Sequence, residues 1–304
     1  MPPARLASLV LLLASVACAD PATTPRSAPA TSTAPAATRS AAPGRDPAQV
    51  YEVTAMVLES PDHGPQLCAG AIATSLPPQC GGPDVAGFEW ADVEGELAQG
   101  GTTYGSWRLV GTFDGKTFRL TEPPSPPAPP TKEPPRSDPT KTPCPEPRGG
   151  WTVVDRAKTG NEAQDAAIGY ARKQPDHSGV WLSWPHGLPG DGDAADHGDP
   201  LLNLAFTGDL ERHEREAREH WGGALCVTKH ARTYRELRRV QAELMDDRAE
   251  AERAGVYLLA GGTDESDNVI RAEVLIADDV TRRWLDEKFG PGMVEVEGRF
   301  QPVG

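Results

Sequence analysis

The sequence predicts an α+β protein with two folded parts and disordered linkers. Three observations lead to this prediction. A proline-dense stretch at 123–148 divides the chain, residues 49–122 form short alternating patterns around two cysteines, and residues 149–304 alternate between helical and strand patterns. We therefore expect a small disulfide-stapled β-barrel with an OB-like arrangement, followed by an α+β sandwich for which a ferredoxin-like fold is the best match.

The first eighteen residues have the pattern of an export signal. Arg5 is followed by an apolar run over 6–16 and then by small residues. The run has about 11 residues, too few to span a bilayer, which takes roughly 20. Cys18 closes a segment that resembles the lipobox of bacterial lipoproteins, where this cysteine becomes the acylated N-terminus. Ser15 departs from the usual aliphatic residue of that motif, and ordinary cleavage after Ala17 is the alternative.

The cysteine count indicates two disulfides. The chain has five cysteines, and if Cys18 carries lipid, four remain to pair in an oxidising compartment. Four cysteines allow three pairings. We favour Cys68 with Cys80, inside one compact segment, and Cys144 with Cys226. An oxidised pair offers no thiolate, so the stretch LCAGAIATSLPPQCGG is interpreted as a structural clamp rather than as a reactive Cys/His site.

Composition and charge limit the partners. Residues 19–48 are almost entirely Ala, Pro, Thr and Ser without apolar periodicity, which predicts a disordered stalk. The net charge of −14 argues against nucleic acid, whose phosphates are neutralised by Lys and Arg, and provides no basic patch for a membrane. We expect contact with the membrane through the lipid anchor only.

Within the β module, each expected strand has its own signal. Residues 51–58 alternate apolar and polar side chains, and the runs 107–113 and 116–121 flank Asp114-Gly115, a strong hairpin signal. With only some seventy residues, a single core is marginal and a covalent staple is expected.

The second part contains four expected helices and five expected strands. The helices are opened by capping residues or closed by glycines, and the strands are short apolar runs. The expected helices are 161–173, 209–221, 233–253 and 278–289, and the expected strands are 201–207, 224–228, 256–261, 269–276 and 293–300.

Three motifs carry a resemblance to a known group of proteins. They are LC...SLPPQCGG, GTTYGSWRLVGTFDGKTFRLTE and LLNLAFTGDLERHEREAREHWGGALCV. With them the chain resembles a group of exported lipoproteins of actinobacteria, over both folded parts but not over the linkers. The resemblance implies an exported location and the two-part architecture, and it transfers no catalytic residue.

The candidate sites are few. His213 and His220 are seven residues apart on one helix face, about 10 Å from each other, too far to share one zinc ion, so we interpret this helix as a solvated charged face. Trp181, Trp184 and His186 form an aromatic patch that is either a ligand cleft or core.

An acidic loop follows this patch. Its carboxylates could bind calcium, although the EF-hand pattern fails and a plain acidic turn is the alternative. The candidate ligands are Asp191, Asp193, Asp196 and Asp199.

These observations favour display of a binding surface over catalysis. The sequence contains no nucleophile elbow, phosphate loop or dinucleotide fingerprint, and we expect no cofactor. The leading expectation is a lipoprotein tethered at the extracellular face of the cell membrane that binds an envelope protein or glycan. A cell-envelope hydrolase with a site near 181–199, and oligosaccharide binding by the OB-like module, are the alternatives.

Overall fold

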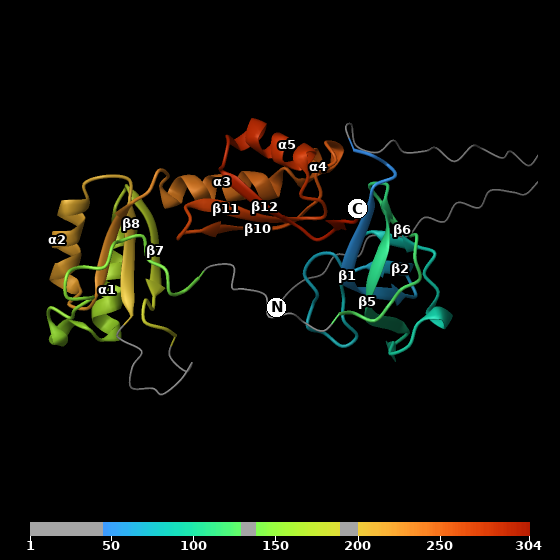
Figure 1. Ribbon diagram of the computed structural model, residues 1–304, viewed down its shortest axis with the longest axis horizontal. Helices are drawn as coiled ribbons and strands as arrows, with labels where there is room; N and C mark the ends of the chain where they lie inside the picture. Colours follow the sequence, from blue (N-terminus) through green and yellow to red (C-terminus); the bar gives the residue numbers. More distant parts are fainter. Residues whose placement is uncertain (1–44, 129–137, 189–199) are drawn as a thin grey trace, which may run out of the picture. The chain divides into compact units, whose positions relative to one another are not determined.

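The structure is a computed structural model that describes residues 45–128, 138–188 and 200–304. The signal segment, Cys18, the stalk up to residue 44 and the four aspartates of the acidic loop lie outside the described residues. The described chain is a mixed α+β fold (Figure 1). It contains two disulfides. No helix among these residues is long and apolar enough to cross a membrane.

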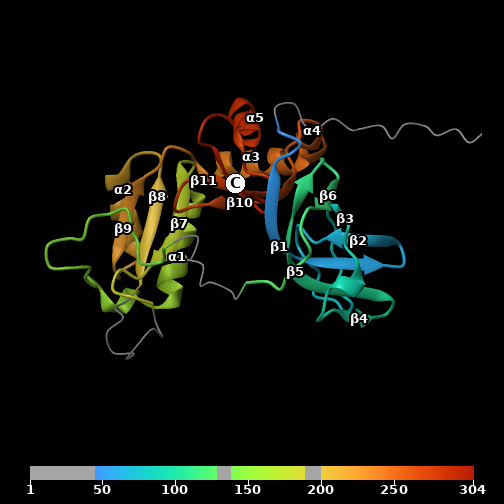
Figure 2. The same ribbon diagram turned by 45° about the vertical axis from the view of Figure 1, so that its right-hand side comes forward.

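The β module contains one sheet of seven strands and a short 3-10 helix, η1 (Trp90–Asp92) (Figure 2). The strands are β1 (Val50–Ser60), β2 (His63–Leu67), β3 (Asp84–Ala86), β4 (Leu97–Gln99), β5 (Thr102–Phe113), β6 (Thr117–Leu120) and β13 (Gln301–Pro302).

The strand pairings of this sheet return to their starting point. β1 pairs antiparallel with both β2 and β5, β2 pairs antiparallel with β3, β3 pairs parallel with β6, and β6 pairs antiparallel with β5. β4 extends β5, and β13 extends β1. The expected hairpin is confirmed: the Asp114 carboxylate accepts hydrogen bonds from the amides of Lys116 and Thr117, which holds the turn between β5 and β6.

The core of the β module is built from the inward side chains of β1 and β5, such as Val53, Val57 and Leu109. Its remaining volume is filled from the far end of the chain, because Ile276 and Phe300 belong to the same buried cluster. Residues 49–122 therefore do not complete their core alone.

The second part consists of two units of the same topology, which we call the first and second αββαβ units. A short 3-10 helix, η2 (Arg156–Lys158), precedes the first unit. The first unit contains α1 (Asn161–Lys173), β7 (His177–Ser183), β8 (Leu201–Phe206), α2 (Leu210–His220) and β9 (Leu225–Lys229). The second contains α3 (Tyr234–Asp246), α4 (Arg248–Arg253), β10 (Leu258–Asp264), β11 (Val269–Val274), α5 (Asp279–Phe289) and β12 (Val294–Gly298).

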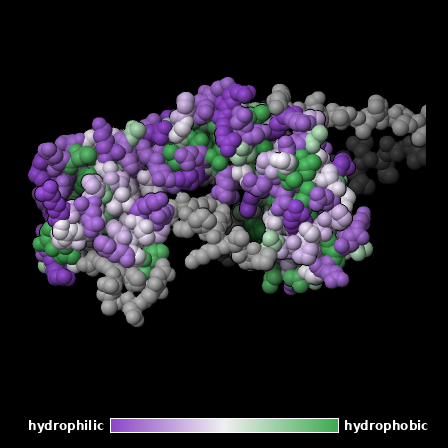
Figure 3. Space-filling model, viewed as in Figure 1, coloured by the Kyte–Doolittle hydropathy of each residue, from purple (hydrophilic) through white to green (hydrophobic). Residues whose placement is uncertain are grey.

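Each αββαβ unit has its own sheet. In both, the first two strands pair antiparallel and the third pairs parallel after a helical crossover, in the orders β7-β8-β9 and β10-β11-β12. The helices of each unit pack on one face of its sheet through separate buried clusters. Hydrophilic side chains cover the outer faces of α2 and α5 in Figure 3.

The expectation of one ferredoxin-like sandwich is therefore corrected, since the described strands of this part form two sheets rather than one. A physical reason lies at the edge of β7. Its Val180 amide donates to the Glu265 carboxylate at 2.7 Å instead of to another strand, so a side chain closes this edge. Within the units, the expected helix over 161–173 agrees with α1, while the expected helix over 233–253 is two helices that meet at Asp247.

Candidate functional site

A short segment crosses the first sheet on the face opposite its helices. We call residues 138–144 the strap. The carbonyl of Pro139 accepts from the Trp184 amide at 2.8 Å, and the carbonyl of Lys141 accepts from the Ser183 hydroxyl at 2.6 Å. The strap thus begins over the end of β7.

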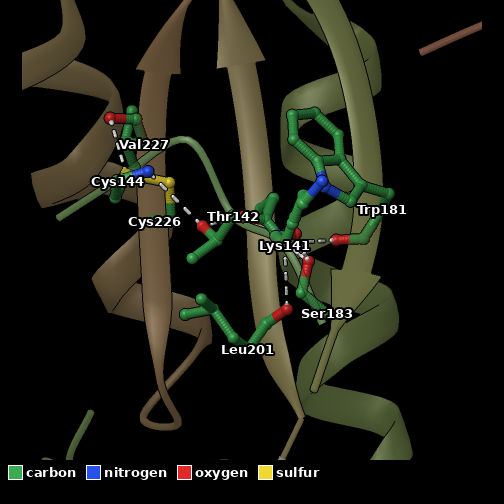
Figure 4. The surroundings of a disulfide bond; sticks show 9 residues. Lys141, Thr142, Cys144, Trp181, Ser183, Leu201, Cys226 and Val227 are labelled. Atoms are coloured by element: carbon green, nitrogen blue, oxygen red, sulfur yellow. Dashed lines mark hydrogen bonds between the residues drawn. A yellow bond between two sulfur atoms is a disulfide. The ribbon is translucent and has the colours of Figure 1, made fainter. Parts of the chain in front are cut away.

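The strap then passes over β8 and ends at β9 (Figure 4). The Thr142 hydroxyl donates to Asn203 Oδ1 at 2.7 Å, and Cys144 is disulfide-bonded to Cys226 with 5.8 Å between the Cα atoms. Asn203 is fully buried, and its amide nitrogen donates to the Ser183 hydroxyl at 2.9 Å. The strap thus supplies the donor for Asn203 Oδ1, because a buried amide oxygen without a hydrogen bond would lower the stability of the fold.

A groove of about 850 Å³ lies beside the strap. Its walls are the strap and Trp181 and Leu182 of β7, and its floor is the β10–β11 hairpin. We call this space the groove. The floor is nearly free of side-chain bulk on β10, because Ala260 is exposed and a Cβ added to Gly262 would meet no atom within 4 Å. A ligand in the groove can therefore approach the main chain of β10 closely.

Trp181 gives the groove a fixed aromatic wall. Its ring is stacked on the ring of His230, with centroids 5.7 Å apart and planes 9° apart. Burial lowers the pKa of His230, which keeps the imidazole neutral at neutral pH, and its Nδ1 is buried without a hydrogen-bond partner. One face of Trp181 is thus occupied by a neutral ring.

The rest of the lining is rich in carboxylates. Burial alone would raise the pKa of Asp264, but hydrogen bonds from Arg271 and Ser266 hold it below the ordinary value. Arg271 Nε donates to Asp264 at 2.7 Å, and the same guanidinium also contacts Asp267 and Glu295. This network fixes the positions of the charges before any ligand arrives.

Ion pairs and hydrogen bonds hold four of these carboxylates in place. Asp264 and Asp267 pair with Arg271, Glu265 accepts from the Val180 amide, and Asp138 accepts from Thr140 at 2.6 Å. A general acid needs a raised pKa and access to the substrate, whereas ion pairing stabilises the charged form.

The sequence-predicted aromatic patch is divided. Trp181 lines the groove, while Trp184 is half-buried beside the strap and His186 is exposed, with its Nε2 3.9 Å from Glu146. The strap was not predicted from the sequence, because residues 138–143 fall within the linker expected at 123–148. The sequence signal that could have revealed the strap is Cys144, because a disulfide-bonded cysteine inside a proline-rich stretch links that stretch to a folded unit.

The first disulfide is a clamp. Cys68 is bonded to Cys80 with 5.4 Å between the Cα atoms, and Cys68 is buried. All four cysteines among the described residues are in disulfides, which is the pairing that we favour from the sequence. The described chain therefore has no thiolate for a Cys/His site.

The interpretation of α2 as a solvated face is wrong at His213, which is fully buried. Its Nδ1 is 2.7 Å from the Tyr170 hydroxyl, and its Nε2 is 2.9 Å from Asp176. The Tyr170 ring lies 6.0 Å from His213 and 6.1 Å from His220 between centroids. The two histidines thus contact one tyrosine, and the described residues contain no group of three or more metal-ligating side chains.

Comparison with known families finds no family model that matches this chain, and comparison with curated proteins finds no match.

Proposed function

We propose that this protein is an exported binding protein of the cell envelope, with the groove beside Trp181 as its ligand site. The observation that carries the proposal is the preformed character of the groove. A disulfide-fixed strap, a stacked tryptophan and carboxylates held by ion pairs line one space of about 850 Å³. Side chains that are already ordered lose little conformational freedom when a ligand binds.

The proposed location is the extracellular face of the membrane, with a lipid anchor at Cys18. Three features support it: the export signal, the lipobox-like segment and the oxidised state of the four described cysteines. The resemblance to exported lipoproteins of actinobacteria points the same way. The proposed partners are an envelope protein or an envelope glycan.

Mass spectrometry of the mature protein tests the location. We expect an N-terminal peptide that begins at Cys18 and carries the mass of a diacylglyceryl group. An unmodified N-terminus at Cys18 would contradict the lipid anchor while leaving export intact.

A pair of tryptophan variants tests the groove. Trp181→Ala removes the aromatic wall, and Trp184→Ala is the matched control because Trp184 is half-buried near the strap but does not line the groove. Soluble peptidoglycan fragments and peptides from envelope proteins serve as probes, with binding measured by calorimetry. We expect Trp181→Ala to weaken binding at least about tenfold and Trp184→Ala to leave it unchanged. Equal binding by the two variants would remove the groove from consideration.

A second candidate function is oligosaccharide binding by an OB-like β module. The cycle of pairings through β1, β2, β3, β6 and β5 favours it, because five strands in a barrel are the basis of OB-type binding surfaces. A pocket of about 230 Å³ lies along Val53–Met56, next to the exposed Ile72 and to Ser106 and Arg299. Loss of glycan binding in Ile72→Glu, with binding retained in Trp181→Ala, would favour this module over the groove.

A further inference from the structure

The two αββαβ units differ in what lies on the face away from their helices. In the first unit, Trp181, Asn203 and Cys226 are in register across β7, β8 and β9, and the strap is bonded to Asn203 and Cys226. In the second unit, Gly262, Arg271 and Glu295 take the corresponding positions across β10, β11 and β12. Their face borders the groove.

The orientation of this second face follows from the alternation of β11. Ile270, Ala272 and Val274 are buried in the cluster that contains the helices α3 and α5. Arg271 and Glu273 alternate with them and are half-buried, so they lie on the opposite face, where they line the groove. Because the two units share one topology, the groove floor on the second unit corresponds to the face of the first unit on which the strap lies.

We propose that the groove accepts an extended, basic polypeptide segment of a partner protein, laid across β10 and β11 as the strap is laid across β7 and β8. The inference rests on the proposed function, because it names the ligand class of the same groove. The strap shows the required geometry within this molecule: residues 139–144 cross three strands, and the carbonyls of Pro139 and Lys141 accept hydrogen bonds. Three strands span about 10 Å, which an extended segment of this length covers.

The shape of the floor suits the main chain of a bound peptide. Ala260 and Gly262 leave β10 without bulky side chains, and Gly262 has open space above its Cα atom. Trp181 borders the same space and offers an aromatic surface for a proline ring or the stem of a lysine.

The charge of the lining selects a basic segment. Among the described residues, two cations line the groove, Lys141 and Arg271, and Arg271 is already engaged by Asp264, Asp267 and Glu295. The carboxylates that line it are Asp138, Asp264, Glu265, Asp267 and Glu273. An acidic segment would meet like charge, whereas lysine and arginine side chains would find nearby carboxylates.

The test uses the full chain, a fluorescent peptide of sequence KPTKTPK, its acidic counterpart EPTETPE, and soluble peptidoglycan fragments. Gly262→Leu fills the floor, and Gly64→Leu is the matched control, because Gly64 is also a strand glycine with no atom within 4 Å of an added Cβ. We expect the basic peptide to bind and the acidic one not to bind. Gly262→Leu should weaken the basic peptide at least about tenfold, Gly64→Leu should not, and high salt should weaken it as well.

Other results separate the inference from the proposed function. If only the peptidoglycan fragments bind and Gly262→Leu abolishes their binding, the groove remains the site but the peptide inference is overturned. If the basic peptide binds equally to both variants, its site lies elsewhere and the inference fails. If no probe responds to Gly262→Leu, both proposals fall. Ala260→Leu, at an exposed position of the same floor, replaces Gly262→Leu if that variant does not fold.

Discussion

The ring of His213 lies flat against the ring of Phe206, with centroids 3.6 Å apart and planes 3° apart. The same imidazole contacts the Tyr170 hydroxyl and the Asp176 carboxylate, and it is fully buried. One side chain thus joins α1, α2, β8 and the turn before β7.

His213→Leu is expected to destabilise the first αββαβ unit by about 3 kcal/mol, because a partly buried carboxylate and a phenol would lose their partner. Chemical denaturation measures the change. Glu214→Ala, at an exposed position of the same helix, is the control and should change the free energy of unfolding by less than about 0.5 kcal/mol. Similar values for both variants would mean that the network contributes little.

His177 predicts a dependence of stability on pH. Burial and the nearby Arg172 lower its pKa from 6.5 to about 4, and its Nε2 has no partner. Between these two values the unfolded chain binds more protons than the folded chain. Stability from this group is therefore complete above pH 6.5 and is lost as the pH falls toward 4, by about 3 kcal/mol at most.

Urea unfolding of the wild type and of His177→Leu from pH 7.5 to pH 4 tests this. We expect the difference in unfolding free energy between the two proteins to move in favour of the variant as the pH falls. The pKa values of Asp264 and Asp278 are lowered from their ordinary value of 3.8, so the titration of these groups changes stability at a lower pH, outside this window. Parallel curves would show that His177 does not titrate as its burial predicts.

The turn between β5 and β6 depends on Gly115. Its φ is +100°, and a Cβ at this position would lie 2.5 Å from the Tyr257 hydroxyl. We expect Gly115→Ala to destabilise the protein by about 1–3 kcal/mol, because backbone strain and the close contact add. Gly64→Ala serves as the comparison, since its Cβ would meet no atom and its φ is ordinary. Thermal unfolding should separate the two variants clearly, and equal midpoints would contradict the prediction.

The two disulfides should differ in their contribution to stability. The bridge between Cys144 and Cys226 closes a separation of 82 residues, against 12 for Cys68 and Cys80. The chain-entropy model gives about 4.5 kcal/mol for the longer loop and about 3 kcal/mol for the shorter. Denaturation of the two double Cys→Ala variants measures this order. A larger loss from the shorter bridge would show that chain entropy does not govern these bonds.

Thr142→Val removes the donor that serves Asn203 Oδ1 and keeps the shape of the side chain. We expect a loss of about 1–3 kcal/mol, since the amide oxygen stays buried. Thr140→Val is the control in the same segment, because Thr140 donates to Asp138 at an exposed site. Limited proteolysis should cut the strap faster in Thr142→Val than in Thr140→Val, and the opposite order would show that this bond does not hold the strap.

The fold was predictable where the signals are local. The helix stop at Gly222-Gly223, the capping residue Asp278 and the turn at Asp114-Gly115 lie within a few residues of the elements that they delimit. β7 escaped prediction because His177–Ser183 mixes polar and apolar residues without alternation, and all of its positions are buried or half-buried. Its partner strand β8, by contrast, is fully buried and is apolar at every position except Asn203.

The site was only partly predictable. Trp181 stood out by its chemistry, but the floor of the groove is defined by Ala260 and Gly262, whose importance is the space that they leave open. The burial of His213 was visible in the spacing of Leu210, His213 and Ala217, three and four residues apart, which is the period of a buried helix stripe. The separation of the two sheets had no local signal, because it depends on contacts such as that of Glu265 with Val180.

Phe300 packs against Tyr51, Phe113 and Phe118 in the core of the β module. Because a polypeptide is synthesised amino end first, almost the whole length of this chain must emerge before those aromatic rings contact Phe300. Until that moment the earliest-emerging strands carry an open apolar seam, so the β module cannot complete its folding in the order of synthesis. Cleavage just before Phe300 would leave that seam permanently uncovered.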